Sequence, residues 1–253
     1  IRRNDWTSGE TYVRYDDADR DLYLRPFYVV TDDFHVYKCI SNNNGDVSTV
    51  KPTGTGTSII TLGDGYQWKY MYTVDTPSAC KFATPRWLPV KELLADDGSN
   101  QWIVQNTTVD GGLHGIKVSV SGVGYTSAPS VTITGDGTGA TATAQIDGSG
   151  IVTRIDIDTP GSGYTEATIT LTGGGFSSPA AAEAIISPPG GHGAHALKEL
   201  GGFYVMVNAE LEEQENGELP IDQDFRKIGL LIDPLEFGTT DRSEELVFDQ
   251  TVR

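Results

Sequence analysis

The stretch Gly63–Val74, which reads GDGYQWKYMYTV, decides the fold. Its Asp-Gly pair predicts a tight turn, and the residues after the turn alternate between aromatic and other side chains. This period of two predicts a β-strand with two different faces. Four aromatic side chains in line need a cover, so we expect them either in the core of this chain or in an interface with a neighbouring subunit. The aromatic face carries Tyr66, Trp68, Tyr70 and Tyr72, and the opposite face carries Gln67, Lys69, Met71 and Thr73.

More strands are predicted on both sides of this stretch. Upstream, residues 26–40 read PFYVVTDDFHVYKCI, in which two apolar runs flank the polar Thr31–Asp33 turn of a β-hairpin. Downstream, we expect one strand in residues 202–209 and a short buried strand in residues 228–232, because both are rich in β-branched and other apolar residues. Few segments favour a helix, and the best of them is Val90–Ala95.

Residues 111–187 contain a degenerate tandem repeat with a period of about 39 residues. Each unit has a Gly-x-Gly-Tyr-Thr motif, then a strand that alternates Val or Ile with Thr, then an Ala-rich strand. We expect this segment to be an insertion presented at the surface, with Tyr125 and Tyr164 closing the ends of a small sandwich or barrel. The units are Gly122–Thr126, Ser130–Gly135 and Ala140–Ile146 in the first copy, and Gly161–Thr165, Ala167–Gly173 and Ala180–Ile186 in the second.

The chain is strongly acidic, and the charge is unevenly distributed. The net charge is −17 over 253 residues; residues 1–95 hold 12 acids and 11 bases, which leaves 23 acids and 7 bases for the rest. Such a surface repels phosphate backbones, so we expect no nucleic acid partner. It suits a partner with basic patches or is simply a solvated acidic face. No apolar run is long enough to span a bilayer, so we expect no membrane insertion.

The two cysteines, Cys39 and Cys80, are too few for a disulfide framework. Each lies in an apolar stretch, which predicts buried free thiols. Free thiols fit a protein that is assembled in a reducing cytoplasm.

No sequence pattern for catalysis, metal binding or cofactor binding stands out. His192 and His195 have a metal-ligand spacing, but a Gly-rich loop without further ligands is better explained as a flexible loop. The aspartates of Asp17–Asp21 imitate the start of a calcium loop that lacks its required glycine. Gly135–Ala140 imitates a dinucleotide fingerprint, but a strand pattern follows it instead of a helix. We therefore expect no catalytic residue, metal or cofactor, and no enzyme.

Five blocks, spread over residues 1–95 and 200–250, form a set in a defined order. They are Ile1–Trp6 (IRRNDW), Val36–Ile40 (VYKCI), Gly63–Tyr70 (GDGYQWKY), Cys80 with Trp87–Val90 (WLPV), and Phe225–Glu236 (FRKIGLLIDPLE). This set resembles the gene-eight wedge subunit of T-even-type contractile phage baseplates, and Gly63–Tyr70 is its most specific block. Two features depart from that family. The Gly/Thr-rich repeat has no counterpart in it, and the family's N-terminal segment does not occur in this sequence.

The resemblance implies a layered antiparallel β-sandwich with an inserted tandem β-repeat domain. A wedge-type β-sandwich domain is expected at residues 1–110 and the inserted repeat domain at residues 111–187. A C-terminal β segment, residues 188–253, is expected to pack with the wedge core or with the family's N-terminal segment.

The resemblance also implies a structural role in the virion. The protein would be a subunit of the baseplate wedge, assembled in the host cytoplasm, that packs against other wedge proteins and against a second copy of itself. Large complementary interfaces would hold the switchable state of the tail before contraction. The aromatic candidates for such interfaces, or for the core, are Trp6, Tyr66, Trp68, Tyr70, Tyr72 and Trp87.

Two other hypotheses stay open. A carbohydrate-binding tail adhesin would use the Gly/Thr/Tyr-rich segment 111–187 to bind a host-surface glycan. A glycan hydrolase would need a defined pair of carboxylates, and no pair among the 35 acids is singled out by the sequence. The adhesin is therefore the stronger of the two alternatives.

Overall fold

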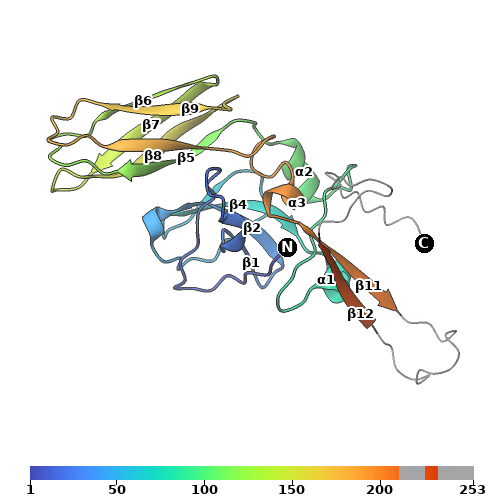
Figure 1. Cartoon of the computed structure of the whole chain (residues 1–253). Helices are drawn as coiled ribbons and strands as arrows, with labels where there is room; N and C mark the ends of the chain where they lie inside the picture. The colour runs from blue at the N-terminus through green and yellow to red at the C-terminus, as the bar shows by residue number, and fades with distance from the viewer. Residues whose placement is uncertain (211–225, 233–253) are drawn as a thin grey trace, which may run out of the picture.

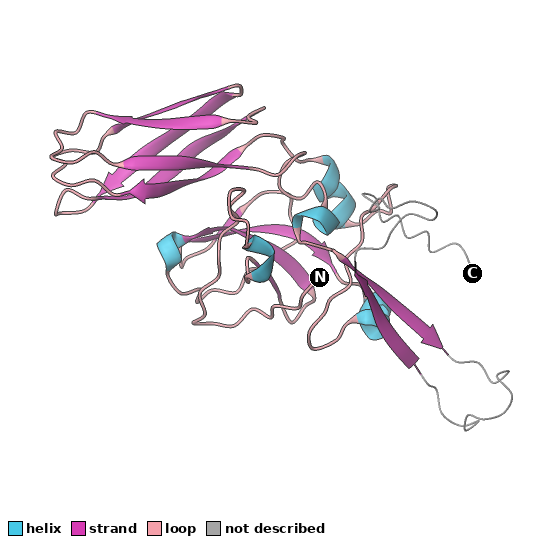
Figure 2. Ribbon diagram, in the orientation of Figure 1, coloured by secondary structure: helices cyan, strands magenta, loops and turns pink. Residues whose placement is uncertain are grey.

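The computed structural model describes residues 1–210 and 226–232, and the protein is mainly β, as predicted. Strands make up 38% of the described residues and form several antiparallel sheets, whereas the helices are short. Figure 1 shows a central sheet, a group of longer strands beside it, and a two-stranded hairpin that extends away from both. The short helices lie around the central sheet and next to the start of the longer strands (Figure 2).

The central sheet has the strand order β1-β2-β4-β3, and every neighbouring pair is antiparallel. The hairpin predicted in residues 26–40 forms its first two strands, and the predicted aromatic strand is β4. We call this sheet, together with the segments and helices of residues 1–110, the first body. Its strands are β1 (Tyr28–Val30), β2 (His35–Asn42), β3 (Ile60–Thr61) and β4 (Tyr66–Thr73).

A β-bulge in β4 changes the prediction for its aromatic face. Tyr37 of β2 pairs with Tyr70, but the preceding Val36 pairs with Tyr72, so Met71 is an extra residue on β4. An extra residue shifts the alternation of faces by one. Tyr66, Trp68 and Tyr70 accordingly share one core cluster, whereas Tyr72 packs with Met71 in another. The prediction that all four aromatics lie on one face is wrong for Tyr72.

Five short helical segments accompany the strands. Both longer helices begin at side chains that cap free backbone N–H groups: Asp75 accepts from Ser78, and Ser99 accepts from Trp102. No helix in the described residues is long and apolar enough to cross a membrane. The segments are η1 (Leu22–Leu24), η2 (Asn43–Gly45), α1 (Thr76–Phe82), α2 (Asn100–Asn106) and α3 (Ala196–Glu199).

The helix predicted at Val90–Ala95 does not form, and that prediction is wrong. Its backbone is held by side chains of α2 instead of by helical hydrogen bonds. Gln105 accepts from the Leu93 N–H at 3.2 Å and donates to the Leu93 carbonyl at 3.0 Å, and Gln101 donates to the Lys91 carbonyl at 2.7 Å. These bonds satisfy backbone groups of this segment without a helix.

Both cysteines are free, but only one is buried. Cys39 lies inside β2, as predicted, and burial raises the pKa of its thiol. Cys80 is exposed, so the prediction is wrong for this residue. The reason is that Cys80 lies on α1, a helix with no buried residue.

The inserted body consists of β5–β10, which follow one another along the chain. β5, β10, β9 and β6 form one sheet in that order, and β7 pairs with β8 in a second sheet. Side chains from both sheets share one core, in which Ile116, Ala144 and Ile155 are buried. The strands are β5 (Leu113–Val120), β6 (Ser130–Gly135), β7 (Thr138–Ile146), β8 (Val152–Ser162), β9 (Ala167–Thr172) and β10 (Ala181–Ile186).

The inserted body begins and ends on adjacent strands. Leu113 at the start of β5 pairs with Ile186 at the end of β10. Just outside them, the Ser187 N–H donates to the Gly112 carbonyl at 3.0 Å, and the Gly112 N–H donates to the Ser187 hydroxyl at 3.1 Å. The chain therefore enters and leaves this body at one place.

The hairpin that extends from the first body is formed by β11 (Tyr204–Glu210) and β12 (Arg226–Ile232), which pair in antiparallel register. Strands predicted at 202–209 and 228–232 are thus present. Tyr204 anchors the hairpin, since its ring lies 4.7 Å from that of Trp87. The acidic stretch 211–224, Phe225 and the Asp233–Glu236 part of the last block lie outside the described residues, as does the predicted burial of the 228–232 side chains.

Candidate functional site

The aromatic candidates are mostly inside the first body. Tyr66 and Trp68 are fully buried, and Tyr70 and Tyr72 nearly so. Trp6 and Trp87 are half-buried; Trp6 donates from its indole Nε1 to the Ser48 hydroxyl at 3.1 Å. The four aromatics of β4 therefore form core, whereas the two tryptophans reach the surface.

The two repeat tyrosines are buried at opposite ends of the inserted body. Tyr125 lies next to Gly150, just before β8, and Tyr164 lies next to Gly111, just before β5. Each hydroxyl accepts a backbone N–H from an Ala-rich segment: Tyr125 from Ala180 at 2.8 Å and Tyr164 from Ala140 at 3.4 Å. Both tyrosines thus close an end of the strand layers from within.

A buried ion pair connects β2 to the C-terminal part of the chain. Lys38 donates to Glu199 of α3, and both side chains are almost fully buried. The same carboxylate accepts the N–H groups of Gly193 and His195, at 2.9 and 3.0 Å. A buried pair needs such extra hydrogen bonds to offset the loss of hydration. The sequence carries one signal for it, a lysine in the middle of an apolar strand.

His192 and His195 do not converge on a metal position. His195 bonds the Glu92 carboxylate through Nδ1 at 2.7 Å, whereas His192 is buried against Tyr15 and His114. Glu199 holds the backbone between them, so His192 is part of the interior and the interpretation of this segment as a flexible loop is wrong for it. Among the described residues, no group of three or more potential metal ligands occurs.

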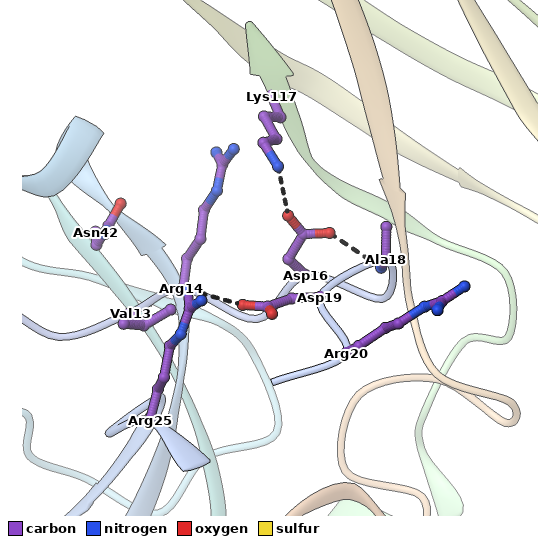
Figure 3. Close-up of a pocket in the computed structure, with 9 residues that line it drawn as sticks. All are labelled: Val13, Arg14, Asp16, Ala18, Asp19, Arg20, Arg25, Asn42 and Lys117. Atoms are coloured by element: carbon purple, nitrogen blue, oxygen red, sulfur yellow. Dashed lines mark hydrogen bonds and ion pairs between the residues drawn. The ribbon is translucent and has the colours of Figure 1, made fainter. Parts of the chain in front are cut away.

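An open, positively charged pocket lies where the first body meets β5. It has a volume of about 420 Å³ and is shown in Figure 3. Four cations line it together with only two carboxylates, an excess of positive charge in a chain whose net charge is −17. The charged lining residues are Arg14, Arg20, Arg25, Lys117, Asp16 and Asp19.

The loop of residues 13–25 positions these charges. Asp16 and Asp19 each accept the backbone N–H two residues later, which fixes both carboxylates. Lys117 lies 3.4 Å from Asp16, and Arg25 lies 3.0 Å from Asp19 (Figure 3). Two of the four cations are thereby neutralised.

The other two cations have no carboxylate partner within the described part of the chain. Among the described residues, Arg14 donates to the Ile116 carbonyl at 3.4 Å; burial lowers its pKa, and the nearby charge of Asp16 opposes this shift. Arg20 is exposed and forms no ion pair with a described residue. Arginine presents a planar fork of donors that matches a carboxylate. The pocket is therefore suited to acidic side chains of another protein.

No protein-family model matches the chain, and no curated protein or solved structure is significantly similar to it. The functional argument therefore depends on the residues, on the geometry described above and on the resemblance of the five sequence blocks.

Proposed function

We propose that this chain is a structural subunit of the baseplate wedge of a contractile phage tail. In this role it assembles in the host cytoplasm, becomes part of the virion, and binds other wedge proteins and a second copy of itself. Its interfaces hold the tail in the switchable state that precedes contraction.

The observation that carries the proposal is that four of the five resembling blocks meet in space and that the fifth is joined to them through β11. Val36–Ile40 and Gly63–Tyr70 lie on adjacent strands, β2 and β4. Ile1–Trp6 contacts Trp87–Val90, because the amino group of residue 1 donates to the Leu88 carbonyl at 2.9 Å and residues 2 and 87 form a β-bridge. Blocks that pack against one another in this order are expected of a single wedge-type domain.

The last block is joined to the Trp87–Val90 block through β11. Its residues 226–232 form β12, which pairs with β11, and Tyr204 of β11 packs on Trp87. The order and the contacts of the blocks both favour a wedge-type domain built from residues 1–110 and the C-terminal β segment.

For the finer architecture, we propose a layered β-sandwich with an inserted tandem repeat. The two units would be β5–β7 and β8–β10. Three features support this: the equivalent tyrosines are equally buried, their hydroxyls accept equivalent backbone N–H groups, and Gly124 and Gly163 before them both have positive φ, 82° and 75°.

The test is assembly. The chain, co-expressed with the other wedge proteins of its phage, is expected to elute with them in one complex on size exclusion with light scattering. Arg20→Glu combined with Arg25→Glu, in the positively charged pocket, should weaken the complex, because basic pockets select acidic partners. The matched control is Arg86→Glu, an exposed arginine of the same body. A wild-type chain that enters no wedge complex contradicts the proposal.

One observation favours the adhesin as a second candidate. At the Tyr125 end of the inserted body, Val120, Val123 and Phe176 are 52%, 53% and 43% exposed. Phe176 packs at 5.3 Å on Tyr125, so an aromatic face is held at this end for stacking on a sugar. A glycan array probed with the chain tests this. Phe176→Ser should abolish a signal that Leu94→Ser, at an exposed leucine of the first body, leaves intact.

A further inference from the structure

A second cavity, separate from the positively charged pocket, lies between the first body and the inserted body. Its volume is about 440 Å³. β4 contributes Lys69, β5 contributes His114, and the segment before α3 contributes His192. The walls also include Thr57 and Ser58, so hydroxyl groups and nitrogen donors surround one space.

Lys69 brings a buried positive charge to this cavity. The residue is 6% exposed, and its ammonium group donates to the Thr57 carbonyl. No carboxylate of the described residues forms an ion pair with it, because the nearby Glu199 is paired with Lys38. Burial, followed by the charge of Lys38, lowers the pKa of Lys69 to about 8. Buried charges are normally paired, so this one calls for an anion.

His192 brings a buried ring nitrogen without a partner. The residue is 5% exposed, and its Nδ1 has no hydrogen-bond partner among the described residues. The His114 ring lies 5.2 Å from it, centre to centre. Burial, and after it the charges of neighbouring bases, lowers the pKa of His114 to about 4 and lowers the pKa of His192 well below its ordinary value. An unpaired buried donor costs free energy unless a ligand satisfies it.

We propose that this cavity binds a small oxyanion, with Lys69 as the charged anchor and His192 as a neutral hydrogen-bond donor through Nδ1–H. Phosphate and carboxylate share the required chemistry, which is compact negative charge on several acceptor oxygens. The hydroxyls of Thr57 and Ser58 complete the set of donors. Because the walls come from both bodies, a bound anion joins them and stiffens the junction.

Binding depends on pH in one direction. The titratable groups that face Lys69 are Lys38 from β2, Glu199 from α3, and the two histidines. An anion favours the protonated lysine, so affinity should be highest at mildly acidic pH and fall as pH rises through the Lys69 pKa of about 8.

The experiment measures binding of inorganic phosphate and of glucuronate to the full chain by calorimetry, at constant ionic strength. Lys69→Met keeps the length of the side chain and should weaken binding about tenfold or more, because charge-assisted hydrogen bonds are lost. His192→Asn should weaken it less. Lys117→Met, in the other pocket, should bind as the wild type does.

Binding by phosphate alone assigns the site to free phosphate-type anions. Binding by glucuronate alone assigns it to a carboxylate-bearing ligand. Either outcome supports the proposal. Circular dichroism of each variant confirms that it is folded. If neither anion binds the wild type, or if the folded Lys69→Met and His192→Asn variants both bind as the wild type does, the proposal is overturned.

Discussion

The first body and the inserted body bury different kinds of side chain. The first body contains large residues, with Trp68, Tyr37 and Tyr66 among its largest fully buried side chains, and it encloses the Lys38–Glu199 pair. The core of the inserted body consists mainly of alanine, valine and isoleucine, with one tyrosine at each end. The backbone of glycine residues packs against the rings of those tyrosines.

This difference predicts two ways of losing stability. In the first body, a few large side chains each exclude much water, so removing one leaves a large cavity. In the inserted body, each core side chain is small, and the close approach of backbone to ring matters more. All four tryptophans lie in residues 1–110, so tryptophan fluorescence reports on the first body, whereas circular dichroism reports on both.

Trp68→Ala should have the largest effect. The indole is fully buried between Tyr12 and Tyr66, and its removal should lower the free energy of unfolding by about 3–5 kcal/mol. Urea unfolding followed by fluorescence of the other tryptophans measures the change. Trp87→Ala, at a half-buried tryptophan, is the control and should lose less. Unchanged stability of the Trp68 variant would mean that the aromatic core contributes little to the stability of the first body.

Lys38→Met should have the second-largest effect. It should lower the free energy of unfolding by about 3 kcal/mol, because it leaves the Glu199 carboxylate buried without its counter-charge. The same fluorescence-detected unfolding measures it. Adding Glu199→Gln should restore part of the loss, since the double variant no longer buries a carboxylate without its counter-charge. A double variant that is less stable than Lys38→Met contradicts this account of the pair.

Gly111→Ala tests the inserted body. It should lower the free energy of unfolding by about 2–3 kcal/mol. Gly111 has φ of 63°, and a Cβ there would lie 2.3 Å from the Tyr164 backbone nitrogen. Gly173→Ala is the matched control, because Gly173 also has positive φ, 77°, but has open space around it. The control should cost about 1 kcal/mol. Equal losses, measured by circular dichroism in urea, would show that backbone conformation and not close packing limits this body.

Tyr125→Phe and Tyr164→Phe should have the smallest effects. Each removes one hydroxyl that accepts a backbone N–H, so each should cost about 1 kcal/mol, as expected for one net hydrogen bond. The loss should be larger at Tyr125, where the donor lies at 2.8 Å, than at Tyr164, where it lies at 3.4 Å. Thermal unfolding followed by circular dichroism measures both. The reverse ranking would contradict the inference that the shorter hydrogen bond contributes more to stability.

Local patterns in the sequence predicted most strands. The alternation of apolar and polar side chains and the turn residues can be recognised within a few neighbouring positions. The hairpin of residues 26–40, the aromatic strand β4 and four strands of the inserted body, β6, β7, β9 and β10, are at the expected places, whereas β5 and β8 were not predicted. Two helices were missed although a local signal was present: Asp75 before Thr-Pro, and Ser99, are ordinary capping residues.

Features that depend on distant residues were not predictable. The bulge at Met71 is visible only in the pairing of β4 with β2. Lys38 is a lysine in an apolar strand, which is a local signal, but its partner Glu199 is 161 residues away. The same holds for Lys69 and His192, which belong to segments far apart in the chain and meet only at the junction of the two bodies.

The adjacent ends of the inserted body have a consequence for how such a chain can change. Gly112 and Ser187 are hydrogen-bonded to each other, so excising everything between them leaves a gap that a short turn closes, with little loop entropy to overcome. Recombination can thus replace these strands with any module whose two ends lie side by side, while the core cluster around Tyr66 and Trp68, which contains no residue of these strands, keeps its contacts.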